Sequence, residues 1–345
     1  MSELLYGEVE EELRAGLRGV LADRAGWQHV LAWTERDETH DAGLWRVLGR
    51  ELGCAGLPVP EELGGSGAGW RETAVVAEEL GRAVAPVPFL GGAVLGVAAL
   101  LASDDRDLLA SVAAGEAVAT LAVPYGSPER PARDGKVTGV ADALAADVLL
   151  LPQEDGLYAY DAPDVTRTPL TTLDRTRPLA DLDFGGARGR RIGGTQAVGR
   201  ALTVGAAILA SEQLGVAEQC LETTVAYVRT RYQFARPIGS YQAVKHRLAD
   251  LWVAVAQARA VARHAADCVA SGGPDTPVAV AIAQSHCSEV VVHAAEQCVQ
   301  LHGGIGFTWE HPAHLYLKRA KSLSAAFGGA HRHRAALGGL VDLAP

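Results

Sequence analysis

The spacing of apolar residues divides the chain into three regions. From about Glu8 to Ala114 apolar residues recur at helical spacing, interrupted by a loop rich in Pro and Gly over Pro58–Ala68. Short β-branched or leucine-rich runs then alternate with Pro, Gly and Asp as far as about Gly194. We therefore predict a mainly α protein with a small β domain. Its parts are an N-terminal helical domain (1–115), a shortened middle β domain (116–193) and a C-terminal four-helix bundle (194–345).

Long helices are predicted for the C-terminal region. They cover about Val198–Thr230, a segment that ends at the helix stop Ser271–Pro274, and about Pro277–Leu301. In the middle helix Val244, Leu248, Leu251, Val255, Ala258, Ala262 and Ala265 step by three or four. All three are rich in alanine and apolar on more than one face, which is typical of a bundle whose helices also bury surface against another subunit.

Composition and charge exclude several classes of protein. The formal net charge of −10 argues against a nucleic-acid binder, because phosphate contacts need concentrated Lys and Arg. The five cysteines form no CxxC pair, so no zinc or other metal site is predicted. The start of the chain lacks a secretory signal, and the apolar run Phe89–Ala102 is too short to span a bilayer. We expect a cytoplasmic protein without membrane insertion.

Two segments resemble the signatures of the acyl-CoA dehydrogenase family. The stretch Arg231–His246 is similar to the family's motif of Arg, Phe-Gly, Ile and Gln, with Ala235 in place of the Gly. The stretch Gln300–Glu310 is similar to its second fingerprint, which continues over His314–Lys321. Gly56–Gly67 and Ala77–Arg82 resemble the N-terminal domain. The resemblance implies the fold of that family and FAD as cofactor.

The resemblance also implies which residues hold FAD. Arg231 would neutralise the pyrophosphate through charge-assisted, bidentate hydrogen bonds. Gly303 and Gly304 would let the backbone approach the adenosine and pyrophosphate of a neighbouring subunit's FAD. The full set of predicted cofactor-binding residues is Arg231, Gln233, Phe234, Ile238, Gln242, Gln300, Leu301, His302, Gly303 and Gly304.

Both positions where the family places its catalytic carboxylate are glycine. A dehydrogenase of this family removes the proton α to the thioester while the flavin takes the β hydrogen as hydride, so it needs a base near the flavin. The resemblance places that base at Gly205 or Gly328. The nearest replacement is Glu212, on nearly the same helix face as Gly205 but about 10 Å further along. Glu212 is therefore the candidate catalytic residue.

We expect FAD-dependent α,β-dehydrogenation of an acyl-CoA, with this chain as the FAD-completing subunit of a heteromeric (α2β2) enzyme. The resemblance is to short subunits that act on bulky acyl-CoAs of lipid or steroid catabolism. The expected partners are the acyl-CoA substrate, a homologous subunit or a second copy of the chain, and electron-transfer flavoprotein or a similar acceptor. The alternatives are a self-sufficient homo-oligomer with a relocated base, a flavin monooxygenase of the same fold, and a scaffold that has lost FAD.

Overall fold

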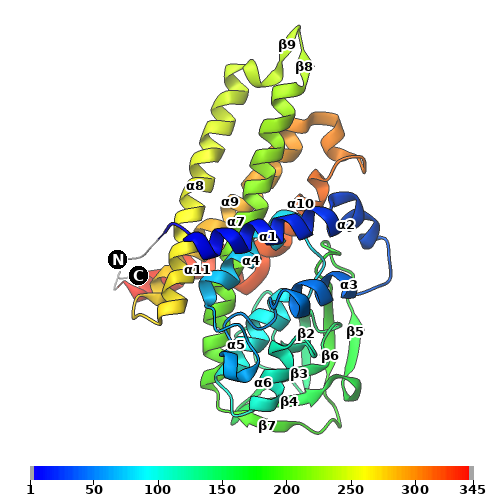
Figure 1. Cartoon of the computed structure of the whole chain (residues 1–345), viewed down its shortest axis with the longest axis vertical. Helices are drawn as coiled ribbons and strands as arrows, with labels where there is room; N and C mark the ends of the chain where they lie inside the picture. Colours follow the sequence, from blue (N-terminus) through cyan, green and yellow to red (C-terminus); the bar gives the residue numbers. More distant parts are fainter. Residues whose placement is uncertain (1–3, 342–345) are drawn as a thin grey trace.

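The computed structural model describes residues 4–341. The first three residues of the predicted N-terminal domain and the last four of the C-terminal bundle lie outside this part. Figure 1 shows the β domain at one end of the molecule and the hairpin β8–β9 at the other, with α7 running between them. Mainly helical structure around a small β region confirms the predicted fold class.

Short helices make up the N-terminal region. The apolar run near Phe89 forms the π-helical segment η3 followed by α5, and both are buried. The elements are α1 (Glu8–Arg24), α2 (Trp27–Thr34), α3 (Ala42–Trp45), η1 (Arg46–Glu51), η2 (Glu61–Leu63), α4 (Trp70–Ala83), η3 (Phe89–Gly96), α5 (Val97–Leu101) and α6 (Arg106–Ala113).

Two small sheets form the β domain. One has the order β1-β3-β4-β7, with β1 and β3 parallel, and the other is the antiparallel sheet β2-β6-β5. A separate apolar cluster that includes Leu149, Tyr160 and Leu182 fills the space between them. The elements are β1 (Ala119–Leu121), β2 (Lys136–Ala141), β3 (Val148–Gln153), β4 (Gly156–Asp161), η4 (Ala162–Asp164), β5 (Thr166–Pro169), β6 (Leu179–Asp183) and β7 (Arg190–Gly193).

The C-terminal region is a helical bundle built on α7. In α8 the predicted stripe is buried from Leu251 onward, and Gly272 ends the helix in a left-handed conformation. Among the described residues one segment, Thr276–Phe307, is long and apolar enough to cross a membrane, but 67% of its most apolar window is buried inside the protein. The elements are α7 (Gln196–Thr230), β8 (Tyr232–Gln233), β9 (Arg236–Pro237), η5 (Ile238–Ser240), α8 (Gln242–Ser271), α9 (Thr276–His302), η6 (Gly303–Phe307), α10 (Ala313–Ala325), η7 (Ala326–Gly328) and α11 (Gly329–Leu340).

Buried ion pairs fasten α1 to α4 and α8. The Glu78 carboxylate accepts hydrogen bonds from the Tyr6 hydroxyl at 2.6 Å and from Arg14 at 2.5 Å, and Arg263 of α8 lies 3.6 Å away. Burial raises the pKa of Glu78, while Arg263 and Arg14 oppose that rise. A buried carboxylate needs such partners, so this cluster fixes how the N-terminal helix lies on the bundle.

Glycines allow α4 and α7 to pack backbone against backbone. A Cβ atom at Gly215 would overlap the carbonyl oxygen of Glu78, and one at Gly81 would overlap that of Glu212. Main-chain oxygens inside helices cannot rotate away as a flexible side chain can. The crossing of these two helices therefore requires glycine at both positions.

We predict opposite effects for two alanine substitutions in α7. Gly215→Ala should lower the free energy of unfolding by about 1–3 kcal/mol or more, because the new methyl group overpacks the crossing with α4. At Gly199 a Cβ atom meets nothing within 4 Å. Gly199→Ala should therefore raise the stability by up to about 1 kcal/mol through helix propensity alone. Urea unfolding followed by circular dichroism measures both, and equal effects of the two substitutions would contradict this account of the crossing.

Candidate cofactor and catalytic sites

The candidate site residues lie at opposite ends of α7. Gly205 and Glu212 are in its first half, near the β domain, whereas Arg231 follows its last residue, Thr230. The 26 positions from Gly205 to Arg231 correspond to about 40 Å of helix at 1.5 Å per residue. This is longer than one FAD molecule can span, so the two ends cannot serve the same cofactor within one chain.

Two side chains fill the space beside Gly205. A Cβ atom built there would overlap the side chain of Leu95 from η3, and it would lie 3.0 Å from Cζ of Phe327. Both side chains are buried. A larger side chain at this position would therefore require Leu95 to move.

The second expected base position, Gly328, lies in a tight turn packed on the β domain. Phe327, Gly328 and Gly329 have φ values of 54°, 101° and 65°, in the left-handed region that favours glycine. The Phe327 amide donates to the carbonyl of Tyr125 at 2.9 Å. Tyr125 belongs to the segment between β1 and β2, so this segment and the turn pack directly together.

Glu212 is buried and ion-paired. Nη2 of Arg177 donates to both of its carboxylate oxygens, at 2.8 and 3.1 Å, and Nη1 of Arg319 lies 3.5 Å from Oε1. Nε of Arg319 is in turn 3.3 Å from Asp174. Two guanidinium groups thus occupy the oxygens of its carboxylate. This geometry argues against the predicted role of Glu212 as a proton acceptor.

The same network continues to the β domain through Arg177. Its Nη1 donates to the Tyr125 hydroxyl at 3.4 Å. Burial alone would lower the pKa of Arg177, but Glu212, Tyr125 and Asp142 together hold it well above its ordinary value. Arg177 is thus a permanent cation in the core, and Glu212 is the counter-ion that it requires.

The predicted cofactor residues near Arg231 form an exposed hairpin. Gln233 ends β8, and Phe234 and Ala235 form the turn with φ values of 51° and 64°. Ala235 therefore adopts the backbone conformation for which the family has glycine at this position. Ile238 lies in η5, and Gln242 begins α8.

The other half of the predicted set lies beside this hairpin. Gln300, Leu301 and His302 form the end of α9, and Gly303 and Gly304 begin η6. The ring of His302 stacks on that of Tyr227, one turn before Arg231, with centroids 4.4 Å apart. The structure therefore brings the two predicted halves together. We call residues 231–242 and 300–309 the distal face.

Aromatic side chains are exposed on and beside the distal face. The exposed fractions are 90% for Phe234, 77% for Phe307, 62% for Trp309 and 61% for Tyr232. Trp252, on the part of α8 that follows, is also 61% exposed. Aromatic rings gathered in this way are typical of a surface that binds a partner or ligand.

The distal face is also basic. Between Glu222 and Asp250 the chain has no acidic residue, although its overall charge is −10. Over the described residues, the exposed guanidinium of Arg231 has no hydrogen bond or ion pair. A Cβ atom built at Gly303 or Gly304 meets nothing within 4 Å, so both backbones are open to approach. This combination fits a pyrophosphate. The basic residues of the segment are Arg229, Arg231, Arg236, Lys245 and Arg247.

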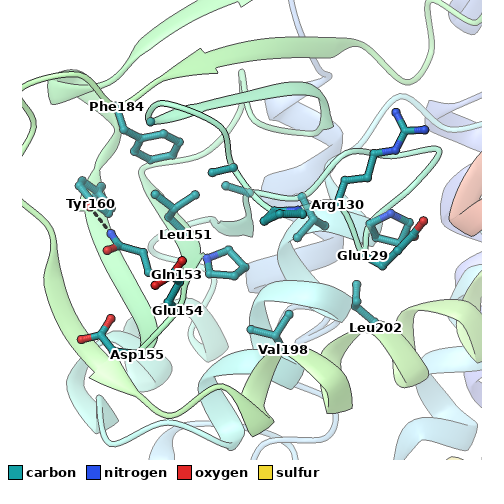
Figure 2. A pocket seen from close by; sticks show the side chains of 17 residues that line it. Glu129, Arg130, Leu151, Gln153, Glu154, Asp155, Tyr160, Phe184, Val198 and Leu202 are labelled. Atoms are coloured by element: carbon teal, nitrogen blue, oxygen red, sulfur yellow. Dashed lines mark hydrogen bonds between the residues drawn. The ribbon is translucent and has the colours of Figure 1, made fainter.

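A separate cavity of about 760 Å³ lies between the β domain and the first turns of α7. Figure 2 shows Glu154 and Asp155 on one side of it and Glu129 and Arg130 on the other. Three carboxylates against one lining guanidinium do not favour phosphate groups. None of the predicted cofactor residues lines this cavity, although Leu202 brings it within one turn of Gly205. The other apolar and aromatic lining residues include Leu151, Tyr160, Phe184 and Val198.

Sequence reasoning missed the residues that fill the region beside the β domain. Leu95 and Phe327 are far apart in the sequence and carry no motif, and Arg177 and Arg319 reach Glu212 from two different domains. The one available signal was the presence of glycine at both expected base positions, which left room for other side chains.

Comparisons with known proteins agree with this architecture. Residues 7–104 match the family described as acyl-CoA dehydrogenase, N-terminal domain, and residues 193–338 match acyl-CoA dehydrogenase, C-terminal domain. The chain is 38% identical over 318 residues to acyl-CoA dehydrogenase IpdE2 of Mycobacterium tuberculosis, covering 91% of each protein.

Two solved structures are similar to nearly the whole chain. A chain of the ChsE4-ChsE5 complex from Mycobacterium tuberculosis superposes with a TM-score of 0.91 at 30% identity, covering 99% of this chain and 100% of that one. A variant of the Tcur3481-Tcur3483 steroid ACAD gives 0.88 at 31% identity, covering 97% and 98%. With both family domains present and a relative matched over nine tenths of its length, this chain belongs to the acyl-CoA dehydrogenase family, whose members are oxidoreductases acting on CH–CH bonds.

Proposed function

We propose that this chain is the FAD-completing subunit of a heteromeric acyl-CoA dehydrogenase. Its distal face holds the adenosine and pyrophosphate of an FAD whose flavin ring lies in a homologous partner subunit. The partner supplies the flavin contacts and the catalytic base. The observation that carries this proposal is the separation of about 40 Å along α7 between Arg231 and Gly205.

The residues of the distal face support the proposal that this face binds the pyrophosphate of FAD. Arg231 offers a planar pair of donors for phosphate oxygens, and Gly303 and Gly304 expose backbone that can approach closely. The neighbouring cations lower the cost of bringing a dianion to this face. When bound, FAD accepts the hydride removed from the β carbon of the acyl thioester.

The region around Gly205 supports the proposal that the flavin ring of FAD lies in a partner subunit. Leu95 and Phe327 occupy the space beside Gly205, and the turn that contains Gly328 is bonded to Tyr125. Side chains and a packed turn thus occupy the places where the resemblance would put the base. We therefore assign the flavin ring, the acyl chain and the catalytic carboxylate to another subunit.

The kind of partner follows from the exposed aromatic residues and from the relatives. Rings such as Phe234, Phe307 and Trp252 need a covering protein surface, and a homologous chain has the matching fold. The relatives include a chain of the ChsE4-ChsE5 complex and a steroid acyl-CoA dehydrogenase, which supports a heterotetramer and a bulky acyl-CoA of lipid or steroid catabolism. We further propose a cytoplasmic enzyme that passes electrons to an electron-transfer flavoprotein or a similar acceptor.

The alternatives receive less support. A self-sufficient homo-oligomer would need a relocated base, and the candidate Glu212 is held by Arg177 and Arg319. A scaffold without FAD does not explain why Arg231 is left unpaired beside two open glycines. Nothing in the described residues favours a flavin monooxygenase over a dehydrogenase.

We predict that Arg231→Ala weakens FAD binding by the assembled complex about 10- to 100-fold. The estimate corresponds to the roughly 1.5–3 kcal/mol of a hydrogen bond to a charged group. The matched control is Arg229→Ala, which removes the same charge two residues earlier and should change the affinity by much less. Quenching of FAD fluorescence during titration measures both. Unchanged FAD affinity in Arg231→Ala would remove Arg231 from the site.

We predict that the isolated chain does not reduce flavin when mixed anaerobically with FAD and a panel of acyl-CoAs. A positioned base accelerates proton removal about 10²–10⁴-fold, and the partner would have to supply that acceleration.

Glu212→Gln should lower the free energy of unfolding by about 3–5 kcal/mol, because Arg177 then lacks its counter-ion. It should leave the turnover of the folded complex unchanged. If the isolated chain with FAD and an acyl-CoA instead showed a rapid loss of flavin absorbance, and Glu212→Gln abolished that loss, Glu212 would be the base.

A further inference from the structure

Three rings form a column at the end of α7: the rings of Tyr227 and His302 are stacked, and those of His302 and His311 are tilted by 40° to each other. His302 lies between Tyr227, with ring centroids 4.4 Å apart, and His311, with centroids 4.1 Å apart. Tyr227 belongs to the last turn of α7, His302 ends α9, and His311 precedes α10. The column thus joins three chain segments that are distant in sequence.

The central ring is held in a fixed orientation. His302 is only 3% exposed, and its Nδ1 is 2.7 Å from the carbonyl oxygen of Cys298, to which it donates. Nε2 is buried and has no hydrogen-bond partner among the described residues. Burial and the neighbouring His302 and His314 lower the pKa of His311 to about 4, so His311 is uncharged at neutral pH and does not repel His302.

The column is linked directly to both halves of the predicted cofactor set. The amide of Arg231 donates to the carbonyl oxygen of Tyr227 at 2.9 Å, which fixes the start of the Arg231 side chain relative to the Tyr227 ring. At the other half, His302 is followed by Gly303, whose φ of 62° turns the backbone out of α9. Movement of the His302 ring would therefore displace Gly303 and Gly304.

The segment also contacts α10 through Trp309, whose ring meets His314 and the Lys318 ammonium, but few of its side chains are buried. Ile305, Phe307 and Trp309 are exposed, and between Gly303 and Trp309 only Gly306 is buried. The rings of Tyr227, His302 and His311 therefore connect this segment directly to the end of α7. Stacked ring pairs contribute about 0.5–1.5 kcal/mol each beyond the area they bury, which is enough to hold a short loop.

We propose that Tyr227, His302 and His311 are positioning residues, which set the distance between the Arg231 side chain and the Gly303–Gly304 backbone so that both reach one pyrophosphate. The proposal rests on the proposed function of the distal face. His302 also belongs to the predicted cofactor-binding set; in this proposal its ring, like those of Tyr227 and His311, acts through the residues attached to it.

The test compares ring removal with ring replacement. His302→Ala and His311→Ala should each raise amide hydrogen exchange over residues 303–307 at least tenfold in the full chain without cofactor. In the assembled complex they should weaken FAD binding about tenfold, with unchanged turnover at saturating FAD. His302→Phe keeps a ring in the column and should restore both properties. His293→Ala is the matched control, because this histidine is exposed on the same helix, α9, outside the column, and it should resemble the unmodified chain.

The outcomes separate this inference from the proposed function. If amide exchange over 303–307 is unchanged in His302→Ala and His311→Ala, the column does not hold the loop and the inference is wrong. If exchange rises and FAD affinity stays the same, while Arg231→Ala loses FAD, the inference is wrong and the cofactor assignment stands. If Arg231→Ala also keeps FAD, both fail. A folding defect would appear as a lowered Tm that His302→Phe does not restore, and this outcome too would count against a positioning role.

Discussion

The length and rigidity of α7 determine what this chain can do. The helix has 35 residues, or about 50 Å, and it is held against α4 by a contact that admits no side chain at Gly215. A helix fixed in this way cannot bend to bring Arg231 toward Gly205. Under the proposed function, an FAD whose pyrophosphate lies at Arg231 therefore cannot place its flavin ring near Gly205 of the same chain, and it has to be completed by another subunit.

The region near the β domain is filled by a buried ionic network. Arg177 and Arg319 come from the β domain and from α10, and both reach Glu212 of α7. Such a network contributes little net stability compared with apolar packing, but it is costly to break, because each remaining charge would stay buried without a partner. It therefore fixes how the β domain docks on the bundle. Leu95 and Phe327 complete the packing beside Gly205.

The sequence predicted the architecture well and the interior less well. Apolar spacing located α8, including its end at Gly272, because periodicity and a glycine stop are local signals. It also predicted the change to β structure, and the resemblance pointed to Arg231 and Gly303. It did not predict the partners of Glu212, because ion pairs between domains leave no spacing in the sequence. Counting residues along the predicted helix placed Glu212 on the same face as Gly205. The spacing alone does not show which side chains from other segments cover that face.

The central claim is tested most directly by counting FAD. The complex, purified with its homologous partner, is denatured, and the released FAD is measured by absorbance against the amounts of both chains. The account predicts one FAD for each pair of chains and none on this chain alone, because only the partner has room for the flavin ring. Two FAD molecules per pair, or a stoichiometric amount on the isolated chain, would contradict it.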